Sequence, residues 1–470
     1  MIIVNPEFHR YVWLNFSSFR LISMPIILML ILYVFSHDQI DVWHASILPP
    51  AFYTFIIVVY LWGNYEAASA SNKDLGQNTW DFQKMSSLSP LEVLIGKLFG
   101  STSYVWYTGL MLLGIIIFSY DSFIEYGKIK RIPLIEDFPA ATHPTAYLLF
   151  SGLMGHATAF FFGTGSFRKK KTEIVVPFVI GIIVSFTVFV LTTSFALKIG
   201  MNGENVKMDW HSLSVHKHTF LICSLLYAFF WIVTASYRNI REELQFKNSP
   251  VVFMIFLVSF CIYVTGYLDT FSHYEIKSLN TFVPKLFVAF LIIIACTYVT
   301  VFMDASNLAK YRRWVYAFNA KEWRRLFEST PLWVGCFILL VPAFLLTNTL
   351  DFHLGNTNKI LNDNFSILGL TCALILFTMR DGFIFHSILL GKIERHKFFL
   401  LVLYIFIFYI LLPYFVSNVI KGSSSETLRN ALQVFYPIPG PSFFYSCAPI
   451  LIQAFIAFFI LRYVVKSLRT

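Results

Sequence analysis

Apolar segments of 15 or more residues recur along the whole chain and are separated by polar intervals. A helix needs roughly 20 mostly apolar residues to cross a bilayer, so segments of this length predict membrane-spanning helices. The segments lie at residues 21–35, 45–61, 104–120, 146–162, 174–196, 220–235, 251–267, 286–303, 332–346, 367–390, 398–416 and 443–464. This pattern predicts an all-α polytopic membrane protein with about 12 transmembrane helices.

The composition agrees with a membrane protein. Of the 470 residues, 57% are hydrophobic and only 13% are charged, whereas soluble domains average about 25% charged residues. The first 20 residues contain no short apolar core ahead of a small-residue cleavage site, so we expect the first spanning helix to serve as the insertion signal. The six cysteines show no C-x-x-C spacing, and we expect them to pack as small apolar side chains.

The placement of basic residues predicts the orientation of the chain. If the N-terminus is cytoplasmic, the intervals on that side hold most of the 36 Lys and Arg residues, including the clusters at 168–171 and 310–325. Such an excess is what the positive-inside rule requires. We therefore expect both termini in the cytoplasm and the chain in the cytoplasmic (inner) membrane. We expect the basic residues behind the net charge of +10 to contact anionic membrane lipids, and we expect no binding of nucleic acid.

The segment count suggests a duplication. Six segments precede residues 248–250 and six follow, which predicts two tandem six-helix halves, residues 1–249 and 250–470. One offset of 224 positions aligns residues 173–174 with 397–398 and residues 237–238 with 461–462. Parallel repeats of this kind build a pathway between two six-helix units.

The longest polar interval of the first half, residues 63–101, has a specific internal pattern. Thr79 is placed to cap a short helix that carries Trp80, Phe82 and Met85. The run Ser89-Pro90-Leu91-Glu92 has the residues of a capping box, with proline at the first helical position. We therefore expect a loop at the membrane surface whose short helix is joined, at a fixed bend, to the third spanning helix.

This interval resembles part of a known family. Glu66 follows the second spanning helix, and the sequence TWDFQKMSSLSPLEVLIGKLFGS leads into the third. This arrangement resembles the permease subunit of type-2 ABC exporters. The opening NPEFHRYVWLNFSSFRLISMP is similar to the N-terminal interfacial helix of that family. The resemblance implies that residues 63–101 form a coupling loop seated on a separate ABC ATPase. The coupling residues in this loop would be Glu66, Trp80, Gln83, Ser89, Pro90 and Glu92.

A second coupling loop is expected at residues 304–333. Thr330-Pro331-Leu332 corresponds to Ser89-Pro90-Leu91, and Trp323 corresponds to Trp80. Glu328 lies between Trp323 and Thr330. This copy differs from the first, because Trp333 replaces the capping-box glutamate and the loop contains six basic residues. Two interpretations stay open: the second loop is degenerate, or it fits a different ATPase surface.

No nucleotide or metal site is indicated. Each Gly-Lys pair lacks the upstream glycine and the following hydroxyl residue of G-x-x-x-x-G-K-[ST], and H-E-x-x-H does not occur. We therefore expect no enzyme activity and no cofactor on this chain, with ATP and Mg²⁺ held by two copies of the partner ATPase. Further accessory subunits stay open.

Three ionisable residues lie inside apolar segments: His156, Arg380 and Asp381. The offset of 224 places His156 on Arg380. Ionisable groups in spanning helices usually face a bundle interior or water, so these residues are candidates for a polar pathway or gate. The alternative is that Arg380 pairs with Asp381 near a helix break and has a structural role.

Two further features stay open. In the resembled family, the place of residues 417–442 holds a helical hairpin that caps the pathway on the outer side, and an ordinary loop is the alternative. Other functions also fit twelve helices. The first alternative is an ion- or proton-driven carrier. A carrier of the major facilitator type would show a G-x-x-x-D-R-x-G-R-like turn between helices two and three and a long central loop, and neither is present. A membrane-embedded glycosyl- or acyltransferase would use Asp38 or Asp41 of the first outer loop.

Overall fold

The structure is a computed structural model. It describes residues 5–36, 43–77, 79–129, 142–169, 174–201, 207–211, 213–268, 282–304, 308–354, 367–391, 397–420, 431–437 and 443–467. Asp38 and Asp41 of the first outer loop lie outside these residues, as do Lys170 and Lys171 of the first basic cluster and most of the outer interval 417–442.

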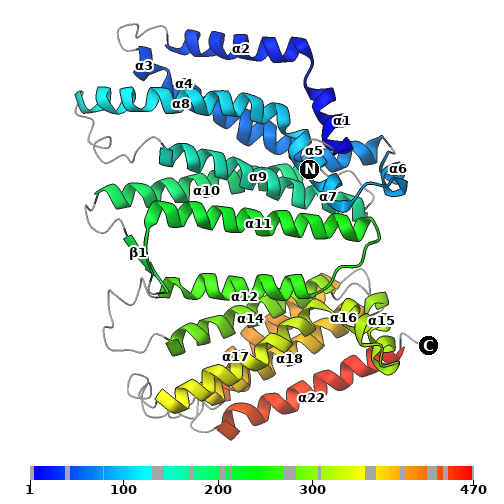
Figure 1. Ribbon diagram of the computed structural model, residues 1–470. Helices are drawn as coiled ribbons and strands as arrows, with labels where there is room; N and C mark the ends of the chain where they lie inside the picture. The colour runs from blue at the N-terminus through cyan, green and yellow to red at the C-terminus, as the bar shows by residue number, and fades with distance from the viewer. Residues whose placement is uncertain are drawn as a thin grey trace. The chain divides into compact units, whose positions relative to one another are not determined.

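Helices account for every one of the twelve apolar segments. Nine helices in the described residues are long and apolar enough to cross a membrane. They are α2 (Ser18–Ser36), α8 (Ser103–Ile129), α9 (Thr142–Lys169), α10 (Val175–Met201), α11 (Lys217–Glu243), α17 (Leu332–Leu354), α18 (Ile367–Leu390), the continuous run of α19 (Lys397–Phe406), η6 (Ile407–Leu411) and α20 (Leu412–Val419), and α22 (Phe443–Ser467). The prediction of a helical, multi-pass membrane protein is confirmed (Figure 1).

The other three apolar segments form shorter or interrupted helices. The second segment is divided among α3 (Trp43–Ser46), α4 (Leu48–Phe55) and the π-helical η3 (Ile56–Gly63). The seventh and eighth are α12 (Val251–Thr265) and α14 (Phe282–Asp304), whose apolar parts are shorter.

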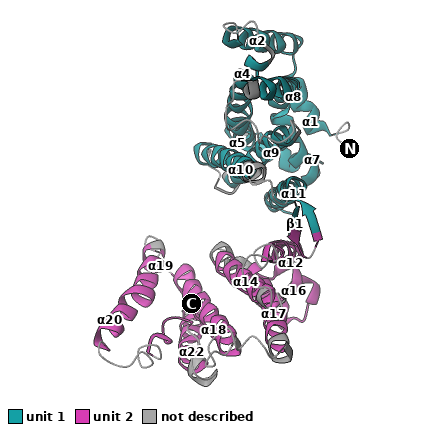
Figure 2. Ribbon diagram, turned by 90° about the vertical axis from the view of Figure 1, so that its left-hand side faces the viewer, with its two compact units in different colours: residues 1–208, 214–248 teal, residues 209–213, 249–470 magenta. Residues whose placement is uncertain are grey.

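The chain divides into two compact units, shown in different colours in Figure 2. Unit 1 comprises residues 1–208 and 214–248, and unit 2 comprises residues 209–213 and 249–470. Six of the twelve apolar segments belong to each unit. Residues 209–213 leave the first half because the Trp210 indole donates a hydrogen bond to the Tyr263 carbonyl oxygen, 3.1 Å away in α12.

One part of the fold is not helical. Strands β1 (Lys207–Trp210) and β2 (Leu213–His216) pair as a two-stranded sheet between α10 and α11. The all-α prediction missed this hairpin, which falls in a polar interval without a long alternating pattern. His211 occupies the left-handed region at φ 47° in the turn.

Helix α9 is the centre of unit 1. It packs against α5 (Asn64–Gly76), α10 and α11. Gly155 of α9 lies so close to α10 that a Cβ atom there would overlap the Ser185 hydroxyl. Small residues at such crossings allow membrane helices to approach closely. In unit 2 the main helix pairs are α18 with α22 and α14 with α17.

The interval 63–101, predicted as a membrane-surface loop with short helices, is largely helical, and its first part is a buried helix instead of a surface loop. Helix α5 continues from η3 without a break, and α6 (Trp80–Met85), α7 (Pro90–Ile95) and η4 (Gly96–Gly100) follow. Eight of the thirteen α5 residues are buried, including Ala68 and Ser71. Small and polar residues here serve close packing against α9, a role that hydropathy alone does not distinguish from a loop. The N-terminal helix is present as α1 (Pro6–Asn15), at the same end of unit 1 as α6 and α7 (Figure 1).

Candidate functional site

The capping box at the start of α7 forms as predicted. The Ser89 hydroxyl accepts a hydrogen bond of 3.3 Å from the Glu92 backbone N–H. The Glu92 carboxylate accepts one of 2.7 Å from the Ser89 backbone N–H, and Pro90 is the first residue of the helix. The Ser89 hydroxyl also donates to the Glu92 carboxylate at 2.7 Å. The two hydrogen bonds that Ser89 donates to this carboxylate, from its backbone N–H and from its hydroxyl, lower the pKa of Glu92. Because Ser89 and Glu92 satisfy each other's backbone groups, the bend between α6 and α7 has a defined geometry.

Helix α6 begins at Trp80 as predicted, but Thr79 does not cap it. No side-chain cap hydrogen bond forms at Thr79. Its hydroxyl instead donates toward the Asp74 carboxylate, at 3.3 Å. The start of α6 is thereby tied to the end of α5.

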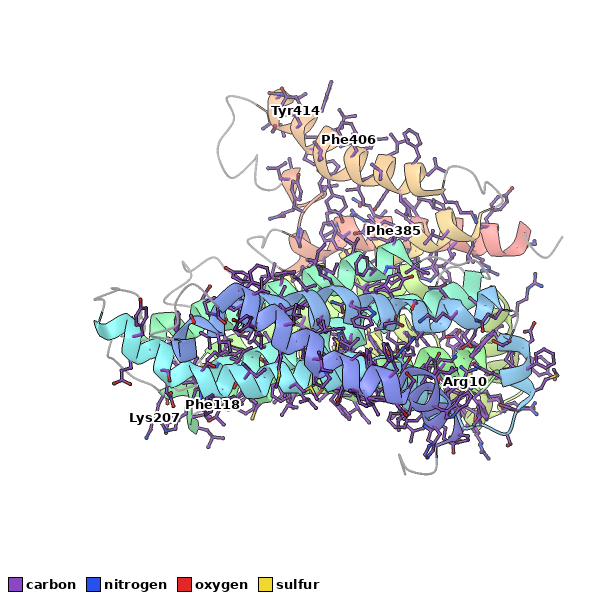
Figure 3. The ribbon with its side chains drawn as sticks, turned by 90° about the horizontal axis from the view of Figure 1, so that it is seen from above. Arg10, Phe118, Lys207, Phe385, Phe406 and Tyr414 are labelled. Carbon is purple, nitrogen blue, oxygen red and sulfur yellow. The ribbon has the colours of Figure 1, made fainter. Side chains whose placement is uncertain are left out.

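An ion cluster lies beneath α6, formed by the buried Glu7, Asp74 and Lys97 and by the partly exposed Arg10, and we call it the Lys97 cluster. Lys97 is fully buried and pairs with Asp74 and, at 3.5 Å, with Glu7. Arg10 approaches Glu7 at 2.7 Å and Asp74 at 3.4 Å. Two cations therefore meet two carboxylates, so the cluster carries no net charge, as buried ions require. It joins α1, α5 and η4, and Figure 3 labels Arg10 at this end of the molecule.

The neighbours of the cluster fix both α6 and α1. Trp80 is 3% exposed, and the Lys97 ammonium lies over its ring, 5.5 Å from the centroid. The Gln83 amide donates to Glu7 at 3.5 Å. Gly96 has no room for a side chain, since a Cβ atom there would lie 2.5 Å from Cγ of Glu7. Glycine at this position thus allows α1 to reach η4.

Burial shifts the pKa of two groups in this region, Lys97 and Tyr11. It lowers the pKa of Lys97 to about 8, while the Glu7 carboxylate acts in the opposite direction. The ammonium form therefore still prevails at neutral pH. Burial raises the pKa of Tyr11 to about 12, so its hydroxyl stays neutral beside the cluster.

The opposite face of α6 is exposed and apolar. Phe82 is 72% and Met85 76% exposed, and Asp81 lies beside them in solvent. The three apolar residues predicted on this helix therefore divide, with Trp80 facing inward and the other two outward. A short helix that is packed against the protein on one face and exposes apolar side chains on the other can bind a protein partner.

Glu66 does not join this arrangement. It pairs with Lys73 at 2.5 Å and accepts a hydrogen bond of 3.3 Å from the Trp62 indole. Its side chain lines a cavity beside α2 and α8 and is not part of the Lys97 cluster.

The expected second coupling loop contains α15 (Leu308–Asn319) and α16 (Trp323–Ser329). Trp323 is 64% exposed, so its environment differs from that of the buried Trp80. Glu328 pairs with Arg324 at 3.5 Å. The Thr330 hydroxyl bonds the Leu326 carbonyl oxygen at 2.7 Å, and Pro331 is buried ahead of α17.

A hydrogen-bond relay that the sequence did not reveal holds this loop. The Trp333 indole donates to the Tyr311 hydroxyl at 2.7 Å, and that hydroxyl lies 2.5 Å from Nε2 of His386. Nδ1 of His386 lies 2.8 Å from the Gly382 carbonyl oxygen. Because a carbonyl only accepts, Nδ1 carries the proton and Nε2 accepts from Tyr311. The relay joins α15, α17 and α18.

His156 is held on both ring nitrogens. The Trp106 indole donates to Nδ1 at 3.1 Å, and Nε2 lies 2.8 Å from the Val59 carbonyl oxygen in η3. Since an indole N–H only donates, the ring is the neutral Nε2–H tautomer. His156 thus links α8, α9 and η3.

Arg380 and Asp381 form a buried ion pair in α18, with Arg380 Nε donating to the carboxylate at 2.9 Å. Asp381 also accepts from the hydroxyls of Tyr298, at 2.9 Å, Tyr404, at 2.6 Å, and Tyr409. Arg380 reaches the Gln453 side-chain oxygen at 2.7 Å. We call these six residues the Arg380 network. All its members belong to unit 2, where it joins α14, α18, α19, η6 and α22.

From the sequence we did not single out Glu7, Arg10 or Asp74 of the Lys97 cluster. We considered Lys97 only as part of a Gly-Lys pair that lacks the rest of the phosphate-loop motif. The available signal was the position of Lys97 between Gly96 and an apolar pair, where a solvated lysine is uncommon. Within the described ranges, no group of three His, Cys, Asp or Glu side chains could hold a metal ion. No family model, no curated protein and no solved structure matches the chain.

Proposed function

We propose that this chain is the permease of an ATP-driven exporter of the type-2 ABC kind, with both permease halves fused and both termini in the cytoplasm. One observation carries the proposal. The short helix α6 exposes Phe82 and Met85, while its inner face is fastened through Trp80 and Gln83 to the Lys97 cluster. A partner ATPase docked on the exposed face would therefore act directly on the spanning helices.

Force applied to α6 has a short route into the membrane. The Lys97 cluster and its neighbours Trp80 and Gln83 join α6 to α1, α5 and η4. Helix α5 follows η3 directly, and only Ser101 and Thr102 separate η4 from α8. Since breaking a buried pair leaves an uncompensated charge, the cluster resists separation. Closure of the ATPases on ATP and Mg²⁺ would thus displace unit 1 helices as a body, in a hinge-type switch.

The carrier alternative draws less support from the described residues. A proton-driven carrier needs a carboxylate or imidazole that titrates during transport. Asp381 is paired with Arg380 and also accepts hydrogen bonds from three tyrosines, so its carboxylate is already engaged within unit 2. His156 has both ring nitrogens engaged. A structural role suits both residues better than proton coupling.

Co-purification tests the proposal. The tagged chain is isolated from its native host in mild detergent, and a nucleotide-binding ATPase is sought by mass spectrometry and ATP hydrolysis. We expect the Phe82→Ser/Met85→Ser variant to lose most of the bound ATPase while remaining folded, because both side chains are exposed. Phe246→Ser is the matched control, since Phe246 is an exposed aromatic residue that follows α11.

Three outcomes would count against the coupling assignment. One is that no ATPase accompanies the wild-type chain. Another is that the double variant retains it, and the third is that the Phe246→Ser control loses it equally. In the last case the loss would follow from any exposed aromatic residue rather than from α6.

A further inference from the structure

A cavity of about 400 Å³ lies in unit 1 beside the start of α2. Its wall is made by the end of α1, by α2, by η3 and α5, and by the start of α8. The volume falls within the range of small-molecule sites. None of the contacts that carry the proposed coupling function lies in it.

One lining residue of this cavity has a buried polar atom without a partner. Ser101 is 3% exposed and lines the cavity, yet its hydroxyl makes no hydrogen bond. Buried hydroxyls are normally hydrogen-bonded, so this group is available to pair with a bound ligand. The backbone carbonyls of Gly100 and Ser101 accept from the Asn15 amide, at 3.2 and 3.5 Å, which holds this wall in place.

One basic side chain lies in the wall of this cavity. Arg20 lines it and makes one long hydrogen bond, 3.5 Å, to the Asn15 carbonyl oxygen. Among the described residues Arg20 has no acidic partner. The carboxylate in the cavity, Glu66, is already neutralised by Lys73. Arg20 and the Ser101 hydroxyl can therefore both donate to an anion.

The rest of the lining suits a lipid. Met24 and Ile27 of α2 and Val105 of α8 supply an apolar wall, and the Trp62 and Tyr104 rings meet edge to face at 5.7 Å. Tyrosine and tryptophan favour the headgroup level of a bilayer. Trp13 and Phe19, near the junction of α1 and α2, are more than three-quarters exposed, as expected of side chains that meet the membrane interface.

We propose that this cavity binds the phosphodiester headgroup of an anionic glycerophospholipid, with Arg20 and Ser101 donating to the phosphate and an acyl chain lying along Met24 and Ile27. The apolar wall favours a lipid over free phosphate, because only a lipid would cover it. The site lies beside the α1–α2 junction, so an occupied site would fix the angle between those two helices.

The experiment measures phospholipid retention by the full chain. The protein is purified in mild detergent, reconstituted in nanodiscs that contain phosphatidylglycerol and phosphatidylethanolamine, re-extracted, and examined by native mass spectrometry. We expect wild type to retain phosphatidylglycerol preferentially. Arg20→Gln should reduce retention about tenfold, as loss of one charge-assisted hydrogen bond implies, and Ser101→Ala should give a smaller loss.

Arg313→Gln is the matched control, since Arg313 is an exposed arginine on α15, outside the cavity. Equal loss in Arg20→Gln and Arg313→Gln would overturn the proposal, as would equal retention of the two lipids by wild type. Displacement of the lipid by excess inorganic phosphate would identify the site as one for free phosphate and would also overturn it. ATPase recovery with Arg20→Gln reads out the coupling function separately.

Discussion

The ammonium of Lys97 lies 3.5 Å from a carboxylate oxygen of Glu7, although the whole of the first two spanning segments separates the two residues in the sequence. This contact brings the N-terminal helix α1 against η4, the entry to α8. Asp74 and Arg10 complete the charges. The first helix of the chain is thus an integral part of unit 1 rather than an appendage on the membrane surface.

Lys97→Met should strongly destabilise unit 1. The substitution leaves two buried carboxylates with only Arg10 to compensate them, and breaking a buried pair in this way costs about 3–5 kcal/mol. The matched control is Lys73→Met, because Lys73 also pairs with a carboxylate but is largely exposed; such pairs contribute about 0–1 kcal/mol. Thermal unfolding in detergent, followed by intrinsic fluorescence, compares the two. Equal melting temperatures for the two variants would contradict a structural role for the cluster.

The capping box predicts a pH dependence. The folded-state pKa of Glu92 is lowered by the Ser89 hydrogen bonds, so its contribution is present above the unfolded pKa and is lost as pH falls through the folded pKa. Wild type should therefore melt above Glu92→Gln at pH 7, and the two curves should converge in acid. A constant difference down to acidic pH would show that the carboxylate charge has no part in the cap.

Gly63→Ala should destabilise the protein, because a Cβ atom there would overlap the His156 ring, which is held by Trp106 and Val59. Displacing the ring leaves buried polar groups unpaired, at about 1–3 kcal/mol. Gly114→Ala in α8 meets no atom within 4 Å and should be neutral or raise stability by up to about 1 kcal/mol. Melting temperatures decide this, and an unchanged Gly63→Ala would mean that the ring has room to move.

The Arg380 network allows a graded test. Asp381→Asn removes the counter-charge of a buried arginine and should cost about 3–5 kcal/mol. Tyr298→Phe removes one donor among several and should cost about 1.5–3 kcal/mol, the range for hydrogen bonds to charged groups. Denaturant unfolding in mixed micelles measures both. If Asp381→Asn kept full stability, the interpretation of these residues as a polar pathway or gate would be favoured instead.

Local features of the chain were predictable to the residue. Helix α18 has the bounds expected from hydropathy, and the Ser89–Glu92 capping box forms as its pattern predicts. The pairing of Arg380 with Asp381 was also foreseeable, since adjacent opposite charges in an apolar helix have few other partners. The three tyrosines that complete that network were not, because they come from other helices.

The candidate site was only partly foreseeable. Helix α6 and its bend at Pro90 were predicted, yet the inward position of Trp80 and the partners of Lys97 were not. The polar stretch after Gly63 was misread as a loop, because small polar side chains that pack helix against helix have the same hydropathy as solvated ones. Trp323 was matched with Trp80 by its distance from a proline, and burial separates the two.

The sequence by itself determined that this protein is helical and crosses a membrane repeatedly, because apolar length and local capping act within a single helix. Only the tertiary structure decided which charges are buried together. Glu7, Asp74 and Lys97 lie on separate helices, and their pairing arises from the close approach of α1 to η4 that Gly96 permits. Desolvation, which makes an ion pair strong or costly, depends on that packing and not on the order of residues.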